Sequence, residues 1–178
     1  MAFYPLTVLL HIVGVIGLFI ALSLEGAMLV RLRAATTTTQ VREWLVLSRV
    51  IDVALPVSAI CILISGLMLT LSVWGWSHAW IDLSLGVLVL MGILGPVING
   101  PRIKAIQGAA QAAPAGDISP ALRHAILNPV LRGYMPVPLF GAAGAVAMMV
   151  LKLGWLGSGM VLAAALGAGL LSAFVRNK

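Results

Sequence analysis

The residues best placed to do chemistry in this sequence are polar side chains inside long apolar segments. His11 and Glu25 interrupt the first such segment. Asp52 opens the second segment, and Asn99 follows the third. Ionisable groups are costly inside a membrane, and those that occur there usually have a function. An imidazole can bind haem iron or another transition metal, whereas a carboxylate can hold a proton or a cation.

The first apolar segment places its polar residues on one helical face. Small and polar residues recur there at three- and four-residue intervals: His11, Gly14, Gly17, Ala21, Glu25 and Met28. Small residues permit the close approach of another helix, so we expect this face to contact protein rather than lipid. At 1.5 Å per residue, His11 and Glu25 lie about 21 Å apart along the axis, so they mark an outer and an inner polar layer.

The inner layer forms a predicted polar cluster at one depth of the membrane. Its members are Glu25, Asp52, Asn99, Arg102 and Arg49. In one interpretation, the two carboxylates pair with neighbouring arginines and lock the helices together. In the other, the carboxylates form a proton or cation site that lines an inner vestibule.

The outer layer combines histidine with tryptophan. His11 is a candidate ligand for haem b or a metal, although it could equally donate a hydrogen bond to a carbonyl or hydroxyl across the bundle. Four tryptophans are predicted at the outer surface: Trp74, Trp76, Trp80 and Trp155. Tryptophan favours the headgroup level, so they form an outer aromatic belt in one interpretation and a ligand-stacking site in the other.

The composition shows which elements must position these side chains. The chain has 178 residues, of which 61% are hydrophobic and 9% are charged. Soluble domains carry about 25% charged residues, so the sequence indicates an integral membrane protein and excludes a nucleic-acid partner. Stretches of about 20 apolar residues can cross a bilayer. They predict an all-α bundle of five transmembrane helices, forming one domain over residues 1–178, with spans at 6–30, 50–73, 80–98, 134–153 and 156–175.

The segments between the spans contain further helix signals. Thr39 is a predicted N-cap for a helix that starts at Gln40 and runs into the second span. In the loop 99–133, residues 107–116 are predicted to be a flexible linker, and Ser119-Pro120 to start a short interfacial helix. The last two spans are rich in Gly and Ala and should form an antiparallel hairpin that packs on itself or on a second protomer.

The basic residues predict the orientation of the bundle. Of the 11 Lys and Arg, all except Lys152 lie on one side of the spans: Arg31, Arg33, Arg42, Arg49, Arg102, Lys104, Arg123, Arg132, Arg176 and Lys178. Positive charge favours the cytoplasmic side, so we expect the N-terminus outside and the C-terminus inside. The expected location is the bacterial inner (cytoplasmic) membrane, with the lipid bilayer as partner and a homo-oligomer or a larger membrane complex as further possibilities.

Several short motifs occur in the first 105 residues: Leu10-His11-Ile12-Val13-Gly14, Arg49-Val50-Ile51-Asp52, Ser65-Gly66, Trp74-Gly75-Trp76 and Trp80. Together they resemble a family of small bacterial integral membrane proteins of unknown function. The first helix is also distantly similar to the HemJ family of membrane protoporphyrinogen oxidases and to the CopD copper-resistance proteins. The HemJ resemblance implies that His11 is associated with haem.

Three functions are compatible with these features. The first is a non-enzymatic membrane protein that binds a partner or a hydrophobic ligand, for example as a small subunit of a membrane complex. It is favoured because the sequence lacks a Walker-type loop, a Cys-x-x-Cys pair and a nucleophile elbow. The second is a haem- or metal-binding redox protein that uses His11. The third is a small proton-coupled transporter that uses Glu25 and Asp52.

Overall fold

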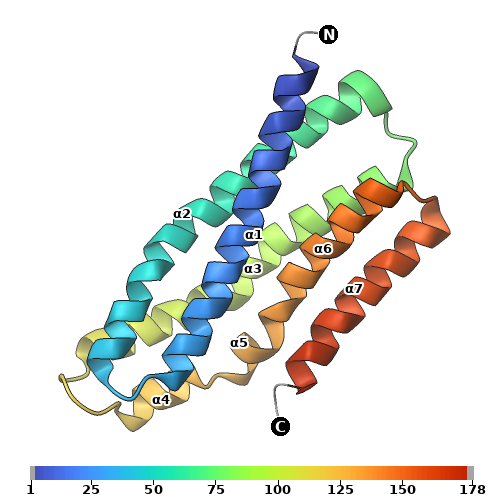
Figure 1. The fold of residues 1–178 in the computed structure, drawn as a ribbon. Coiled ribbons are helices and arrows are strands. Elements are labelled where there is room, and N and C mark those ends of the chain that lie inside the picture. The colour runs from blue at the N-terminus through green and yellow to red at the C-terminus, as the bar shows by residue number, and fades with distance from the viewer. Residues whose placement is uncertain (1–2, 176–178) are drawn as a thin grey trace.

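The computed structural model describes residues 3–175, and all of their regular elements are helices (Figure 1). In chain order these are α1 (Tyr4–Ala34), α2 (Thr38–Leu69), the π-helical turn η1 (Thr70–Trp74), α3 (Ala79–Ala112), α4 (Pro120–Ile126), α5 (Pro129–Tyr134), α6 (Pro136–Leu151) and α7 (Trp155–Val175). Gly75 follows η1, and its φ of 77° lies in the left-handed region that favours glycine.

The predicted number of membrane spans is confirmed. Five helical segments are long and apolar enough to cross a membrane: Tyr4–Ala34, Thr38–Trp74, Ala79–Ala112, Pro120–Leu151 and Trp155–Phe174. The first three are longer than a bilayer requires. The 34 residues of α3, for example, extend over about 51 Å, against a hydrocarbon core of about 30 Å. These helices are therefore longer than the thickness of a hydrocarbon core.

The prediction that residues 99–133 form a loop is wrong in its first part, because α3 is longer than expected. Helix α3 continues through Pro101 to Ala112, so the first half of the predicted linker 107–116 is helical. Hydropathy marks where the apolar environment ends, whereas the helix continues because Ile103 and Ile106 are buried against neighbouring helices. The fourth span also differs from its prediction, because the helix is interrupted at Met135 and begins again at Pro136.

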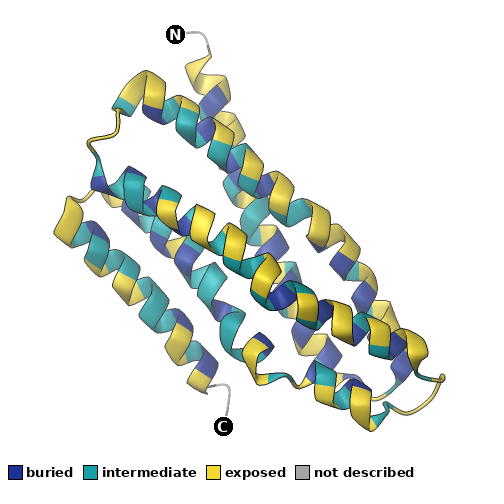
Figure 2. Cartoon of the chain, turned by 180° about the vertical axis from the view of Figure 1, so that it is seen from behind, coloured by how far each residue is buried: buried dark blue, intermediate teal, exposed yellow. Residues whose placement is uncertain are grey.

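Two layers of helices make up the bundle, and exposed positions run along the outward sides of the long helices (Figure 2). One layer is the antiparallel pair α1 and α2, and the other contains α3, α6 and α7. The predicted small-residue face of α1 does contact another helix. A Cβ added at Gly14 would lie 2.9 Å from Cγ1 of Ile62, and one at Gly17 would lie 2.6 Å from Oγ of Ser58. The backbones of α1 and α2 therefore approach closely.

The last two helices form the expected antiparallel hairpin, which packs on itself. A Cβ added at Gly144 in α6 would lie 2.7 Å from Cβ of Ala165 in α7. Closer to the end of α7, a Cβ at Gly169 would lie 3.2 Å from Cα of Val137. Lys152 directly follows α6 and has a left-handed backbone conformation, with φ 49° and ψ 42°. This conformation ends the helix and allows the chain to turn into α7.

A hydrophobic core fills one end of the bundle, where α1 ends and α2 begins. Its largest fully buried side chains come from five helices: Met28, Leu32, Val41, Ile106, Leu122, Ile126 and Leu131. Arg42 caps α3 by donating to the carbonyls of Ala110 and Ala113. Arg123 donates to the carbonyls of Arg33 and Ala35. We call this the basic end, because the described Lys and Arg residues other than Lys152 lie toward it.

The helices α4 and α2 both begin at the basic end, and the structure can be compared there with the predicted starts. The start of α4 is confirmed, because the hydroxyl of Ser119 accepts from the backbone N–H of Leu122 and Pro120 follows. The apolar face of α4 is nevertheless buried in the protein core, and not turned toward lipid as an interfacial helix requires. The N-cap of α2 is Thr37, two residues before the predicted Thr39, and it accepts from the N–H of Gln40. The predicted basic residues Arg176 and Lys178 lie outside the described residues.

Candidate functional site

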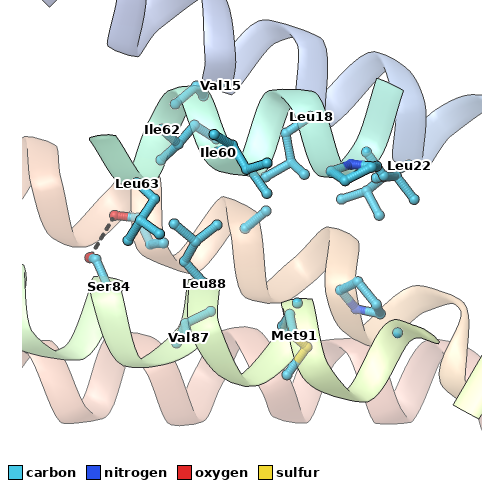
Figure 3. A pocket seen from close by; sticks show the side chains of 18 of the residues that line it. Val15, Leu18, Leu22, Ile60, Ile62, Leu63, Ser84, Val87, Leu88 and Met91 are labelled. Atoms are coloured by element: carbon cyan, nitrogen blue, oxygen red, sulfur yellow. Dashed lines mark hydrogen bonds between the residues drawn. The ribbon is translucent and has the colours of Figure 1, made fainter. Parts of the chain in front are cut away.

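A cavity of about 840 Å³ lies between the two layers. Figure 3 shows its apolar walls, to which α1 contributes Val15, Leu18 and Leu22, α2 contributes Ile60, Ile62 and Leu63, and α3 contributes Val87, Leu88 and Met91. The fourth wall comes from α6. The only hydrogen bond drawn there joins the hydroxyl of Ser84 to the carbonyl of Ala145, which lie 3.5 Å apart. The middle of the bundle is thus hollow and mostly apolar, in contrast to the packed basic end.

Polar side chains line the two ends of this cavity. The end nearer the α6–α7 turn, here called the outer end, carries His11, Thr70, Trp74, Trp80 and Lys152. The end nearer the hydrophobic core, here called the inner end, carries Glu25, Asp52, Asn99, Lys104, Gln107 and Tyr134. The two polar layers expected from the spacing of His11 and Glu25 therefore belong to one elongated cavity.

Glu25 and Asn99 form the central contact of the inner end. The amide Nδ2 of Asn99 donates to Oε1 of Glu25 over 3.1 Å. Both residues are buried, with 8% and 7% of their surfaces exposed. The amide oxygen Oδ1 of Asn99 is also buried, and it has no hydrogen-bond partner in the described part of the chain. A buried amide oxygen of this kind loses its hydration and gains nothing in return from the protein.

The arginines of the predicted inner cluster do not neutralise Glu25 in residues 3–175. Its carboxylate accepts a hydrogen bond from the Asn99 amide instead. Arg102 instead donates to the carbonyl of Ile98 one turn earlier, and Arg49 is exposed. Asp52 is exposed as well, but it lines the same end of the cavity. The structure thus joins Glu25 to Asn99, places Asp52 on the lining of the same cavity and directs the guanidinium of Arg102 to the backbone.

His11 is held in one orientation by Ser65 of α2. Its Nδ1 lies 3.0 Å from the hydroxyl oxygen of Ser65, and that hydroxyl lies 2.5 Å from the carbonyl oxygen of Cys61. Serine has one hydroxyl hydrogen, and a carbonyl can only accept, so the hydroxyl donates to Cys61 and accepts from His11. When the imidazole carries one proton, that proton is therefore on Nδ1, and Nε2 has the free lone pair.

The predicted aromatic belt divides into two parts. Trp74 and Trp80 pack edge to face with centroids 5.5 Å apart, and His78 lies 6.0 Å from each ring. Lys152 places its ammonium 4.2 Å from the centre of the Trp74 ring, within the range of a cation–π interaction. Trp76 and Trp155 are exposed, as expected of residues at a membrane interface. Trp74 and Trp80 instead close the outer end of the cavity.

Sequence reasoning missed several residues of the cavity, among them Tyr134, Gln107 and the hydroxyl of Ser65 in its role toward His11. Gln107 falls in the predicted linker, yet it lies in α3 and donates to the hydroxyl of Ser48 over 2.9 Å. Ser65 carried a usable signal, since a serine in a membrane helix seeks a hydrogen-bond partner on a neighbouring helix. Tyr134 carried none, because its position depends on the break between α5 and α6.

No protein-family model, curated protein or solved structure matches this chain. Among the described residues, no group of three or more His, Cys, Asp or Glu is placed to hold a metal ion. The cavity and its two polar ends are therefore the features from which a function must be argued.

Proposed function

We propose that this is a membrane protein that binds an elongated hydrophobic ligand in the cavity between its two helical layers. The observation that carries the proposal is the cavity itself, which measures about 840 Å³ and is walled mostly by apolar side chains. Ligand sites usually have volumes of roughly 300–1,000 Å³, with apolar walls and a few well-placed polar groups. The packing of the chain supports a binding role, because its large buried side chains gather at the basic end and leave the middle open.

The test is direct binding of a simple apolar probe. Tritiated hexadecanol is added to immobilised protein in detergent, and the bound label is measured by scintillation proximity with excess unlabelled hexadecanol as competitor. Leu88→Trp adds a bulky ring to the wall of the cavity and should weaken the displaceable signal. Leu90→Trp adds the same side chain at an exposed position of the same helix and should leave it unchanged. Equal signals from Leu88→Trp and the unchanged protein would contradict the proposal.

We also propose that the basic end faces the cytoplasm of a bacterium, with the N-terminus outside. The asymmetry of Lys and Arg between the two ends supports this orientation. In a Cys61→Ser background, Ser77→Cys reports on the outer loop and Ala115→Cys on the basic end. A membrane-impermeant maleimide should label the first variant in intact cells and the second only after permeabilisation. The reverse pattern would overturn the orientation.

A second candidate function is binding of haem, or of another metal centre, through His11. The observation in its favour is the Ser65 hydrogen bond, which orients the ring at the cavity wall and leaves Nε2 to ligate iron. Lys152 at the same end could pair with a haem carboxylate. Protein purified from haem-replete cells should then show a Soret band that shifts on reduction with dithionite and is absent in His11→Ala. A featureless spectrum would exclude this candidate and leave the apolar ligand as the proposed function.

A further inference from the structure

The outer end of the cavity carries an ammonium group that forms no ion pair with a carboxylate in residues 3–175. Lys152 lines the cavity, and its Nζ lies 4.2 Å from the centre of the Trp74 ring. Trp74 packs edge to face on Trp80, which lines the same end. Within the described part of the chain, the Lys152 side chain has this aromatic contact alone. A ring face carries no net charge, so the positive charge of Lys152 remains available to a ligand in the cavity.

The charged side chains of the lining differ between the two ends of the cavity. The inner end has the carboxylates of Glu25 and Asp52 and the ammonium of Lys104, which together carry one negative charge. At the outer end, Lys152 is the one lining side chain with a permanent charge, because Asp82 in the first turn of α3 does not line the cavity. An anionic head group is therefore attracted to the outer end and repelled from the inner end.

A carboxylate is the head group that suits the outer end. The Lys152 ammonium has one positive charge and three N–H donors. A carboxylate has one negative charge and accepts from such donors in charge-assisted hydrogen bonds, which are roughly twice as strong as neutral ones. A primary alcohol can also accept a hydrogen bond from the ammonium, but it brings no charge.

The middle of the cavity suits an alkyl chain. The side chains that form its walls, such as Leu63, Leu88 and Met91, are apolar (Figure 3). The hydroxyl of Ser84, which also lines the cavity, is directed to the carbonyl of Ala145. A chain whose head lies at Lys152 would therefore pass the two tryptophans and continue among apolar side chains.

We propose that the cavity selects long-chain fatty acids, with the carboxylate bound by Lys152 beside Trp74 and Trp80 and the alkyl chain extending from the outer end into the apolar middle. This inference rests on the proposed function, because it names the class of hydrophobic ligand that the same cavity takes. The selectivity comes from the outer end alone, so it can fail while the cavity still binds apolar chains.

The experiment compares two probes that share one chain and differ in the head group. Hexadecanoate and hexadecanol compete for tritiated hexadecanol on the immobilised protein, at a mildly alkaline pH at which the fatty acid is ionised. Hexadecanoate should bind about fivefold more tightly, as expected of an ion pair with an exposed lysine. Lys152→Gln removes the charge and keeps a long polar side chain, so it should abolish the preference and leave the affinity for hexadecanol unchanged. Lys152→Arg should retain the preference.

The matched control is Lys104→Gln, the same change at an exposed lysine that lines the opposite end of the cavity. It should retain the full preference for hexadecanoate. Loss of the preference in Lys104→Gln and not in Lys152→Gln would overturn the outer-end site. Equal affinities of the unchanged protein for the two probes would also overturn it and leave the proposed function standing. Failure of both probes to displace the label would overturn both.

A third competitor distinguishes a fatty acid from an anionic phospholipid. Dioleoylphosphatidylglycerol also carries one negative charge, but its phosphate belongs to a lipid with two chains. It should displace less label than hexadecanoate at the same concentration, and equal displacement would overturn the assignment to fatty acids. If Lys152→Gln does not fold, as judged by gel filtration, the comparison of probes on the unchanged protein and on Lys104→Gln still decides the question.

Discussion

Nδ2 of Asn99 on α3 lies 3.1 Å from Oε1 of Glu25 on α1, so one hydrogen bond joins the two helical layers at the inner end of the cavity. Both side chains are buried. A buried carboxylate that loses a hydrogen-bond donor inside a membrane protein keeps its desolvation cost without that compensation. The contact therefore links the stability of the bundle to two residues that line the cavity.

Asn99→Ala should lower the free energy of unfolding by about 1–3 kcal/mol, because it leaves the buried Glu25 carboxylate without its donor. The measurement is unfolding of the protein in mixed micelles by increasing sodium dodecyl sulfate. Glu25→Leu combined with Asn99→Ala should cost less than the sum of the two single changes. Additivity within about 0.5 kcal/mol would show that the two residues do not stabilise each other.

Gly14→Ala should destabilise the bundle by about 1–3 kcal/mol, since the new methyl group would lie 2.9 Å from Cγ1 of Ile62 and 3.2 Å from its backbone nitrogen. Gly86→Ala is the matched control. Nothing lies within 4 Å of its added Cβ, and alanine is favoured over glycine in helices by about 1 kcal/mol. The two changes should therefore have opposite signs in the same unfolding assay. Equal effects would mean that α1 and α2 do not pack through Gly14.

His11 should carry its proton on Nδ1 at alkaline pH, where the imidazole holds a single proton. Nitrogen-15 chemical shifts of labelled histidine distinguish the two tautomers, and His11→Gln identifies the His11 signals by their loss. Ser65→Ala removes the acceptor and should shift the population toward the Nε2–H tautomer. A wild-type signal from the Nε2–H form would contradict the hydrogen-bond direction assigned to Ser65.

Thr37→Ala should cost about 1 kcal/mol of stability, because the Thr37 hydroxyl caps the first turn of α2. Thr39→Ala should be nearly neutral, since Thr39 is exposed and lies inside the helix. Thermal unfolding of the two variants decides between the cap seen in the structure and the one expected from the sequence. A larger effect at Thr39 would favour the predicted start.

The number of spans could be predicted because hydrophobic length is a property of the chain alone. The predicted N-cap of α2 was wrong by two residues. The four consecutive threonines at 36–39 can all serve as caps, and tertiary contacts determine which of them does so. One such contact is the hydrogen bond from the backbone N–H of Thr38 to the carbonyl of Gly116. The extension of α3 to Ala112 was missed for the same reason, since it depends on burial against α2 and α4.

The members of the site were easier to predict than their partners. Glu25, Asp52 and Asn99 stand out as polar residues at one depth, and the structure places all three on one cavity. The choice between an arginine and Asn99 as the partner of Glu25 depends on side-chain direction, which depth does not specify. The cavity itself had no sequence signal, because the spacing of apolar residues shows which face a helix buries but not how far apart two layers stand.

The uneven packing of the bundle also has a mechanical consequence. The two layers are clamped at the basic end by the hydrophobic core and by Arg42, whereas at the outer end the short segment between η1 and α3 and the Trp74–Trp80 contact join them. Separating the two layers at the basic end would therefore require unpacking of the core, whereas at the outer end it would require Trp74 and Trp80 to part and the short segment to extend.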